Sequence, residues 1–119
     1  MLPRKYRLPL RTELVRVQKE GKLFQGRLFS LLVTKQPPTT NHQSPTTRFG
    51  FIISTKVHKK AVKRNRAKRL LSEAIMGLAL GIKPDFDIIV LARKKVIEAN
   101  LEEIRKEIER LFIKAEVID

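Results

Sequence analysis

Cysteine and tryptophan are both missing from this chain of 119 residues. The lack of cysteine excludes disulfide bonds and zinc sites built on thiolates, and it suits a reducing compartment, so we expect the protein in the cytoplasm. No apolar run approaches the roughly 18 residues of a membrane span. The first ten residues, MLPRKYRLPL, lack the apolar centre of a signal peptide. We therefore expect neither membrane insertion nor secretion.

Acidic residues are scarce in the first part of the chain. Residues 1–70 hold 18 Lys and Arg but only two acids, whereas residues 71–119 hold eight basic and ten acidic residues. The formal net charge of +14 therefore belongs to one part of the molecule. A positive field concentrated in this way is typical of a surface that binds a polyanion.

The same scarcity argues against a protein nuclease. The basic part has no cluster of Asp and Glu that would hold Mg²⁺. His42 and His58 are isolated, and no Ser–His–Asp set is present. The sequence therefore predicts no catalytic residue and no metal site in the polypeptide.

Positive charge is densest in residues 56–70, KVHKKAVKRNRAKRL, which contain eight basic side chains and no acid. Side chains at this density repel one another unless an anion lies alongside, and nucleic acid offers phosphates at a matching density. A merely solvated helix face would intersperse Glu with Lys, as Glu102 and Lys106 do later in the chain. The segment therefore predicts a helix that binds nucleic acid.

The hydrophobic pattern predicts an α+β fold with one roughly four-stranded sheet and helices packed on it as a two-layer sandwich (α-β-β-β-α-β-α). We expect one domain over residues 1–119. Its expected parts are a basic extended arm (1–9), a helix capped by Thr12 (12–20), strands broken at Gly26 (23–35), a mobile loop (37–47), a strand (48–55), a long helix (58–79), a buried strand (86–92), a helix begun by an Asn100–Glu103 capping box, and a tail (115–119).

The long helix has two different halves. At about 100° per residue, an apolar stripe forms from Ala67, Leu70, Leu71, Ala74, Ile75 and Leu78. We expect this stripe to anchor the C-terminal half to the core while the N-terminal half presents cations.

One segment resembles a known family. GFIISTKVHKKAVKRNRAKRLLSEA (50–74), with Arg64-Asn65-Arg66 followed by Lys68-Arg69-Leu70, is similar to the signature of the bacterial ribonuclease P protein subunit. Lys19-Glu20-Gly21, Gly26-Arg27-Leu28-Phe29 and the strand FDIIVLAR (86–93) look like other parts of that family. The resemblance extends over residues 8–113, nearly the whole chain.

The resemblance implies a basic RNA-binding protein that pairs, as a monomer, one to one with a large catalytic RNA. Together they remove the 5′ leader from precursor tRNA. The RNA carries out the hydrolysis with bound Mg²⁺, and the polypeptide, which needs no cofactor of its own, supplies binding. The resemblance also implies a left-handed crossover from strand 48–55 through helix 58–79 to strand 86–92, where general rules favour a right-handed one.

Two sets of site residues follow from the resemblance. The set that faces the catalytic RNA is Lys56, Lys60, Arg64, Asn65, Arg66, Lys68 and Arg69. The set in the cleft that holds the substrate leader, between the first helix and the sheet, is Leu14, Gln18, Phe29 and Leu32. Relatives often carry aromatic rings at the positions of Leu14, Gln18 and Leu32, where bases stack. We therefore expect a weaker or differently built leader site here.

Two other readings of the charge pattern stay open at this point. One is a ribosomal or other structural RNA-binding protein without a processing role. The other is a DNA-binding regulator that places the basic helix in a major groove, although the sequence shows no helix-turn-helix spacing and no dimerisation element.

Overall fold

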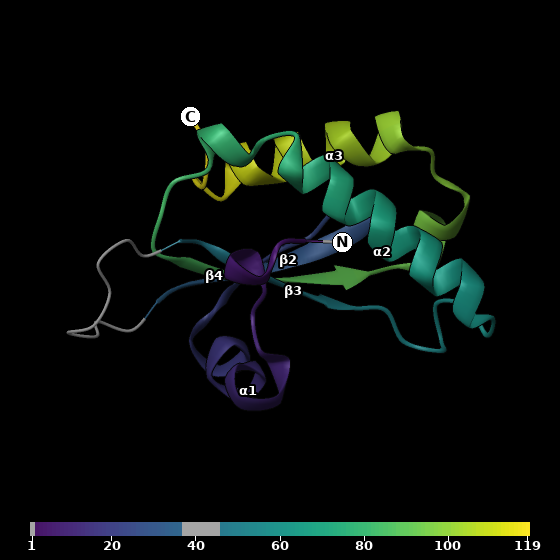
Figure 1. The fold of residues 1–119 in the computed structure, drawn as a ribbon, viewed down its shortest axis with the longest axis horizontal. Coiled ribbons are helices and arrows are strands. Elements are labelled where there is room, and N and C mark those ends of the chain that lie inside the picture. Colours follow the sequence, from purple (N-terminus) through teal and green to yellow (C-terminus); the bar gives the residue numbers. More distant parts are fainter. Residues whose placement is uncertain (1, 37–45) are drawn as a thin grey trace.

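The computed structural model describes residues 2–36 and 46–119. Figure 1 shows a twisted sheet with helices on both of its faces. The helices are α1 (Leu10–Glu20), α2 (Ala61–Met76) and α3 (Leu101–Lys114), and the strands are β1 (Lys22–Phe24), β2 (Phe29–Lys35), β3 (Arg48–Ile52) and β4 (Phe86–Ala92). This order confirms the predicted α+β arrangement, including the break between β1 and β2 at Gly26.

The sheet has the strand order β1-β2-β4-β3. β2 is antiparallel to both β1 and β4, and β3 runs parallel to β4. The connection between the two parallel strands contains α2, as predicted, and its left-handed sense stays a prediction. α2 and α3 cover one face of the sheet, and α1 lies alone on the other (Figure 1).

The main core lies between the sheet and the α2–α3 layer. Successive side chains of a strand point to opposite faces, so alternate residues of β2 and β4 enter this core. Its fully buried members include Phe29 and Leu31 of β2, Ile88 and Val90 of β4, Leu71 and Ala74 of α2, and Ile104, Ile108, Leu111 and Phe112 of α3. The predicted stripe of α2 is confirmed in its centre, while Leu70 and Leu78 are half-buried at its margins.

A smaller cluster lies on the α1 face. Leu8, Val17, Leu32 and Ile89 are buried in it, and Leu10, Leu14, Ile52 and Leu91 are partly buried around them. Within α1 itself only Val17 is buried. Apolar packing therefore holds α1 to the sheet over a small area.

Two helix boundaries differ from the prediction. α1 begins at Leu10, with Pro9 as its N-cap, and the Thr12 hydroxyl donates a hydrogen bond to the Pro9 carbonyl (3.3 Å) instead of capping the helix. Proline suits a helix start because it has no N–H to leave unpaired. α2 is shorter than predicted, since residues 58–60 precede it as a bend and Gly77 follows its end.

The N-terminal arm is not simply extended. Arg4–Tyr6 form a 3-10 turn, and Leu2 and Leu8 are buried. The Leu8 N–H donates to the Phe49 carbonyl at 2.8 Å. Because β3 is an edge strand, the arm covers part of its open edge.

The last residues are not a loose tail either. Glu116 adopts a left-handed conformation (φ 62°), and the N–H groups of Glu116 and Val117 donate to the carbonyls of Ile113 (3.0 Å) and Phe112 (2.9 Å), which closes the end of α3. Val117 is fully buried, and its carbonyl accepts the Lys83 N–H at 2.8 Å. Val117 and Ile118 of the predicted tail are thus part of the core.

Most of the predicted mobile loop, residues 37–45, lies outside the described residues. Its last residue, Thr47, is described and buried. The Thr47 hydroxyl donates to the Lys83 carbonyl and accepts the Phe86 N–H at 3.2 Å. This end of the predicted loop is therefore held against the start of β4.

Candidate nucleic-acid interface

α2 and the turn before it present unpaired positive charge to solvent. Lys56 and Lys60 are exposed before the helix, and Asn65, Arg66 and Arg69 are exposed along it. In the part of the chain that the structure describes, no carboxylate forms an ion pair with any cation of residues 56–69. No carboxylate of the described residues neutralises these charges, so they can meet an anion, although Arg64 and Arg66 also donate to backbone carbonyls.

Arg64 differs from its neighbours. It is half-buried, and its Nη1 donates to the carbonyls of His58 and Lys59, both at 2.8 Å. These bonds hold the bend that leads into α2. Arg64 thus fixes the chain beside the exposed cations, a role that its place in the basic run did not reveal.

Lys68 lies at the margin of the basic face. It is half-buried and lines, with Arg7 of the arm, a hollow of about 170 Å³ beside Gly50 and Phe51. Of the seven residues predicted to meet the catalytic RNA, five are thus exposed to solvent, and Arg64 and Lys68 are half-buried.

Sequence reasoning did not assign two further residues to this surface. Val62 is 77% exposed and shares a shallow hollow of about 430 Å³ with Asn65, Arg66 and Arg69. Lys94, in the 3-10 turn Lys94–Glu98, lines a second hollow with Arg66. The exposed valine in a run of cations was the only available signal, because Lys94 is distant from α2 in sequence.

The predicted leader cleft is only partly assembled. Leu14 and Leu32 pack in the small cluster on the α1 face, and Gln18 is exposed on α1. Phe29 is fully buried in the main core, on the opposite face of β2. Residues three apart in a strand point to opposite faces, so Phe29 cannot line a cleft with Leu32. The prediction for Phe29 is therefore wrong.

Ile52 and Leu91, and not Phe29, lie on the α1 face of the sheet. They are paired in register on β3 and β4, and both pack partly buried against the same cluster as Leu14. We call Leu14, Gln18, Leu32, Ile52 and Leu91 the α1-side surface. It is largely aliphatic and contains no aromatic ring.

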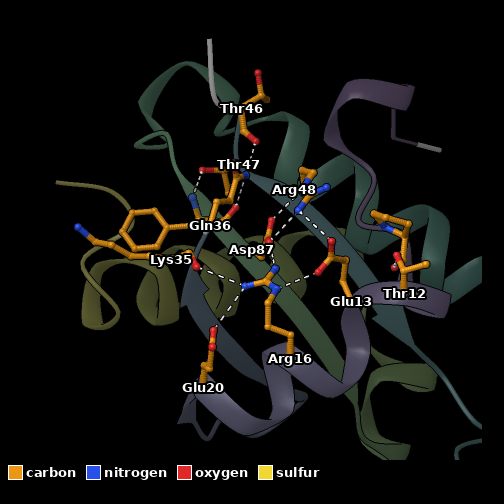
Figure 2. A network of polar contacts seen from close by, with 12 residues as sticks. Thr12, Glu13, Arg16, Glu20, Lys35, Gln36, Thr46, Thr47, Arg48 and Asp87 are labelled. Carbon is orange, nitrogen blue, oxygen red and sulfur yellow. Dashed lines mark hydrogen bonds and ion pairs between the residues drawn. The ribbon is translucent and has the colours of Figure 1, made fainter. Parts of the chain in front are cut away.

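A network of ion pairs joins α1 to the sheet (Figure 2). Asp87, near the start of β4, is fully buried. Arg48 of β3 binds it with two hydrogen bonds of 2.9 Å, from Nε to Oδ1 and from Nη2 to Oδ2. Arg16 of α1 donates from Nη2 to Oδ2 of the same carboxylate. A carboxylate buried in this way needs such partners, since an unpaired buried charge is very costly.

Glu13 also takes part, and we call Glu13, Arg16, Arg48 and Asp87 the Asp87 network. Glu13 Oε2 accepts from Arg16 Nε at 2.8 Å, and Glu13 Oε1 lies 3.9 Å from Arg48 Nη2. At the edge of the network, Arg16 Nη1 donates to the Lys35 carbonyl at 3.4 Å and lies 3.7 Å from Glu20 Oε2. Burial acts to lower the pKa of Arg16, but hydrogen bonds to Glu13 and Asp87 and their negative charges outweigh it and raise that pKa. Sequence reasoning missed this network, although an aspartate inside the apolar strand FDIIVLA was a signal for it.

The acids of the described chain do not form a metal site. Across residues 2–36 and 46–119, no three His, Asp or Glu side chains gather in a way that could hold a metal ion. Glu103 closes a capping box with Asn100 at the start of α3, which confirms that prediction. In the same described ranges, none of the helices has the length and apolarity to cross a bilayer.

Comparison with known proteins decides the family. The family model for Ribonuclease P matches residues 2–116. The chain belongs to the ribonuclease P protein family. This confirms the resemblance drawn from the basic helix and its flanking strands.

Curated members of the family are similar over almost their whole length. The chain is 38% identical over 117 residues to the ribonuclease P protein component of Rippkaea orientalis. The match covers 98% of this chain and 91% of the relative. It is 34% identical over 116 residues to that of a Picosynechococcus species, covering 98% and 95%.

Solved structures of the family agree. The Staphylococcus aureus ribonuclease P protein superimposes with a TM-score of 0.80 at 26% identity, over 96% of this chain and 98% of that one. The Thermotoga maritima protein gives a TM-score of 0.78 at 28% identity, over 91% and 96%. The fold is therefore that of the ribonuclease P proteins.

Family membership settles the broad role. The chain is the protein component of ribonuclease P, an endoribonuclease of tRNA processing, and RNA is its partner in the holoenzyme. These comparisons give no support to the alternative of a ribosomal or structural RNA-binding protein.

Proposed function

We propose that α2 and the turn before it bind the catalytic RNA of ribonuclease P. The observation that carries this proposal is the set of exposed cations Lys56, Lys60, Arg66 and Arg69, for which the described residues supply no carboxylate partner. Each cation that contacts a phosphate releases condensed counterions, so affinity falls as salt rises. Asn65, between two arginines, reaches a 2′-hydroxyl or a base edge.

The α1-side surface is the proposed site for the single-stranded 5′ leader of precursor tRNA. Leu14, Ile52 and Leu91 offer apolar side chains to base faces, and the exposed Gln18 amide can hydrogen-bond to a base edge. Stacking on an aromatic ring is worth about 1–3 kcal/mol per base, and these aliphatic side chains do not supply it. This chain therefore holds the leader by apolar contact and hydrogen bonding more than by stacking.

Bond cleavage, in this proposal, belongs to the RNA. The buried carboxylates Asp87 and Glu107 are held in ion pairs, and Glu103 caps α3. Mg²⁺ held by the RNA would supply the metal-ion chemistry of the hydrolysis, while this chain contributes binding. The protein acts in the cytoplasm as one copy per catalytic RNA.

Cleavage of precursor tRNA by the cognate catalytic RNA, with Mg²⁺ at moderate salt, tests the function. We expect the protein to tighten binding of precursor tRNA more than binding of mature tRNA, because only the precursor carries a leader. An equal effect on both would contradict the leader site. If the protein tightened the binding of neither precursor nor mature tRNA, or if the polypeptide cleaved precursor tRNA without the RNA, the whole proposal would be contradicted.

A further inference from the structure

α1 carries different chemistry on its two flanks. At about 100° per residue, Leu10, Leu14 and Val17 point towards the sheet, and Glu13, Arg16 and Glu20 lie along one flank. Arg11 and Gln18 lie along the other flank, next to Leu14. The first flank holds the Asp87 network, whereas the second borders the α1-side surface.

The sheet beneath α1 repeats this division. Asp87 and Leu91 are four residues apart on β4 and point to the same face, with Ile89 between them. Ile89 is buried in the cluster that includes Val17 of α1. α1 therefore crosses the sheet over Ile89, with the ion pairs on one side and the aliphatic surface on the other.

The ion pairs restrict how α1 can move. Arg16 binds Glu13 on its own helix and Asp87 on β4, and Asp87 also binds Arg48 on β3 (Figure 2). A planar guanidinium that serves two carboxylates has a fixed orientation. Only Val17 of α1 is fully buried, with Leu10 and Leu14 partly buried beside it, so the ion pairs add a constraint on the crossing angle to this small apolar contact.

We propose that Arg16 and Asp87 are positioning residues, whose ion pair sets the crossing angle of α1 and thereby the position of Leu14 and Gln18 relative to Leu91 on the α1-side surface. This inference rests on the proposed leader site. Neither residue needs to touch the leader. Rotation of α1 about the Asp87 network moves Leu14 and Gln18 relative to Leu91.

Arg16→Lys tests the idea because it keeps the positive charge but loses the guanidinium group that binds the carboxylates of Glu13 and Asp87 together. We expect the holoenzyme with this variant to lose about fivefold or more of its preference for precursor over mature tRNA. Its affinity for the catalytic RNA should stay unchanged. Arg105→Lys, at an exposed position on α3, is the matched control and should alter neither quantity.

The outcomes separate the possibilities. The positioning role would be overturned if Arg16→Lys kept the preference for precursor over mature tRNA. It would also be overturned if the variant lost this preference and its affinity for the catalytic RNA to the same extent. Gln18→Glu tests the leader site itself by placing a negative charge on the α1-side surface. If Gln18→Glu lowers the preference and Arg16→Lys does not, only this inference fails. If Gln18→Glu has no effect either, the proposed leader site fails.

A second measurement does not depend on activity. The chain contains no cysteine, so spin labels can be placed at Lys19→Cys on α1 and Arg93→Cys beyond β4, both exposed. We expect the distance distribution between the labels to broaden or shift in Arg16→Lys and in Asp87→Asn. A distribution identical to that of the parent in both variants would overturn the inference.

Discussion

The carboxylate of Glu107 in α3 accepts the backbone N–H of Leu28, just before β2, at 3.1 Å. The same oxygen accepts the Arg27 N–H at 2.6 Å, and the other oxygen accepts Arg110 Nη2 at 2.7 Å. Glu107 is almost fully buried. One side chain therefore ties α3 to the turn between β1 and β2 and satisfies two backbone donors there.

Glu107→Gln should lower the free energy of unfolding in a pH-dependent way. Burial acts to raise the pKa of Glu107, but hydrogen bonds from Arg110 and from the Leu28 and Arg27 N–H groups outweigh it and lower that pKa. A lowered folded-state pKa stabilises the protein above the unfolded-state pKa, about 4.3, and this stabilisation is lost as the pH falls through the folded-state pKa. We expect a cost of about 1–3 kcal/mol at pH 7.

Urea denaturation at pH 7 and again below pH 4 checks this expectation. The difference between parent and variant should shrink as the pH falls through the lowered folded-state pKa of Glu107, because the parent side chain then becomes neutral like glutamine. An equal difference at the two pH values would show that the charge of Glu107 is not what stabilises the fold.

Gly26→Ala should destabilise the same turn. A Cβ at Gly26 would lie 2.5 Å from the Phe29 carbonyl oxygen and 3.0 Å from Glu107 Oε2, so the backbone must move. We expect a cost of more than about 1 kcal/mol in thermal or chemical unfolding. Gly81→Ala is the matched control, because a Cβ there meets nothing within 4 Å. It should be neutral or stabilise by about 0.4–1 kcal/mol, and equal losses in both would contradict the steric argument.

Arg66→Ala and Arg69→Ala should weaken binding to the catalytic RNA without changing thermal stability. Each lost phosphate contact should reduce the slope of log affinity against log salt by about one unit. Filter binding over a salt series, together with melting curves, measures both effects. Lys106→Ala, at an exposed position on α3, removes the same charge from another surface and should leave the slope unchanged. A lower melting temperature with unchanged RNA binding would contradict the orientation of α2.

Gln18→Tyr should strengthen leader binding. It places a ring where the family resemblance predicts one, and one stacked base is worth about 1–3 kcal/mol. The affinity for precursor tRNA should rise about fivefold or more while that for mature tRNA stays constant. A rise for both RNAs, or for neither, would speak against a leader base beside Gln18.

Local signals in the sequence were enough for several elements. The strand FDIIVLA was predicted with the bounds of β4, because a short apolar run between turn residues leaves little choice. The capping box of Asn100 and Glu103 fixed the start of α3. The basic face of α2 followed from charge density, which depends on composition more than on packing.

Other features depend on contacts distant in sequence. The resemblance placed Phe29 in the leader cleft, and only the packing of the sheet against α2 and α3 assigns it to the main core. Val117 seemed to lie in a tail because its burial requires α3 and Lys83 around it. The Asp87 network joins residues of α1, β3 and β4, so no local pattern could group them.

The N-terminal arm has a consequence for the state of the protein in solution. β3 is an edge strand, and the arm occupies part of its open side through the bond from Leu8 to Phe49. Without residues 2–8, that side would offer unsatisfied backbone donors and acceptors to a neighbouring molecule. The arm thus limits pairing of β3 with strands of other molecules. Repulsion between copies that each carry a net charge of +14 opposes such aggregation further.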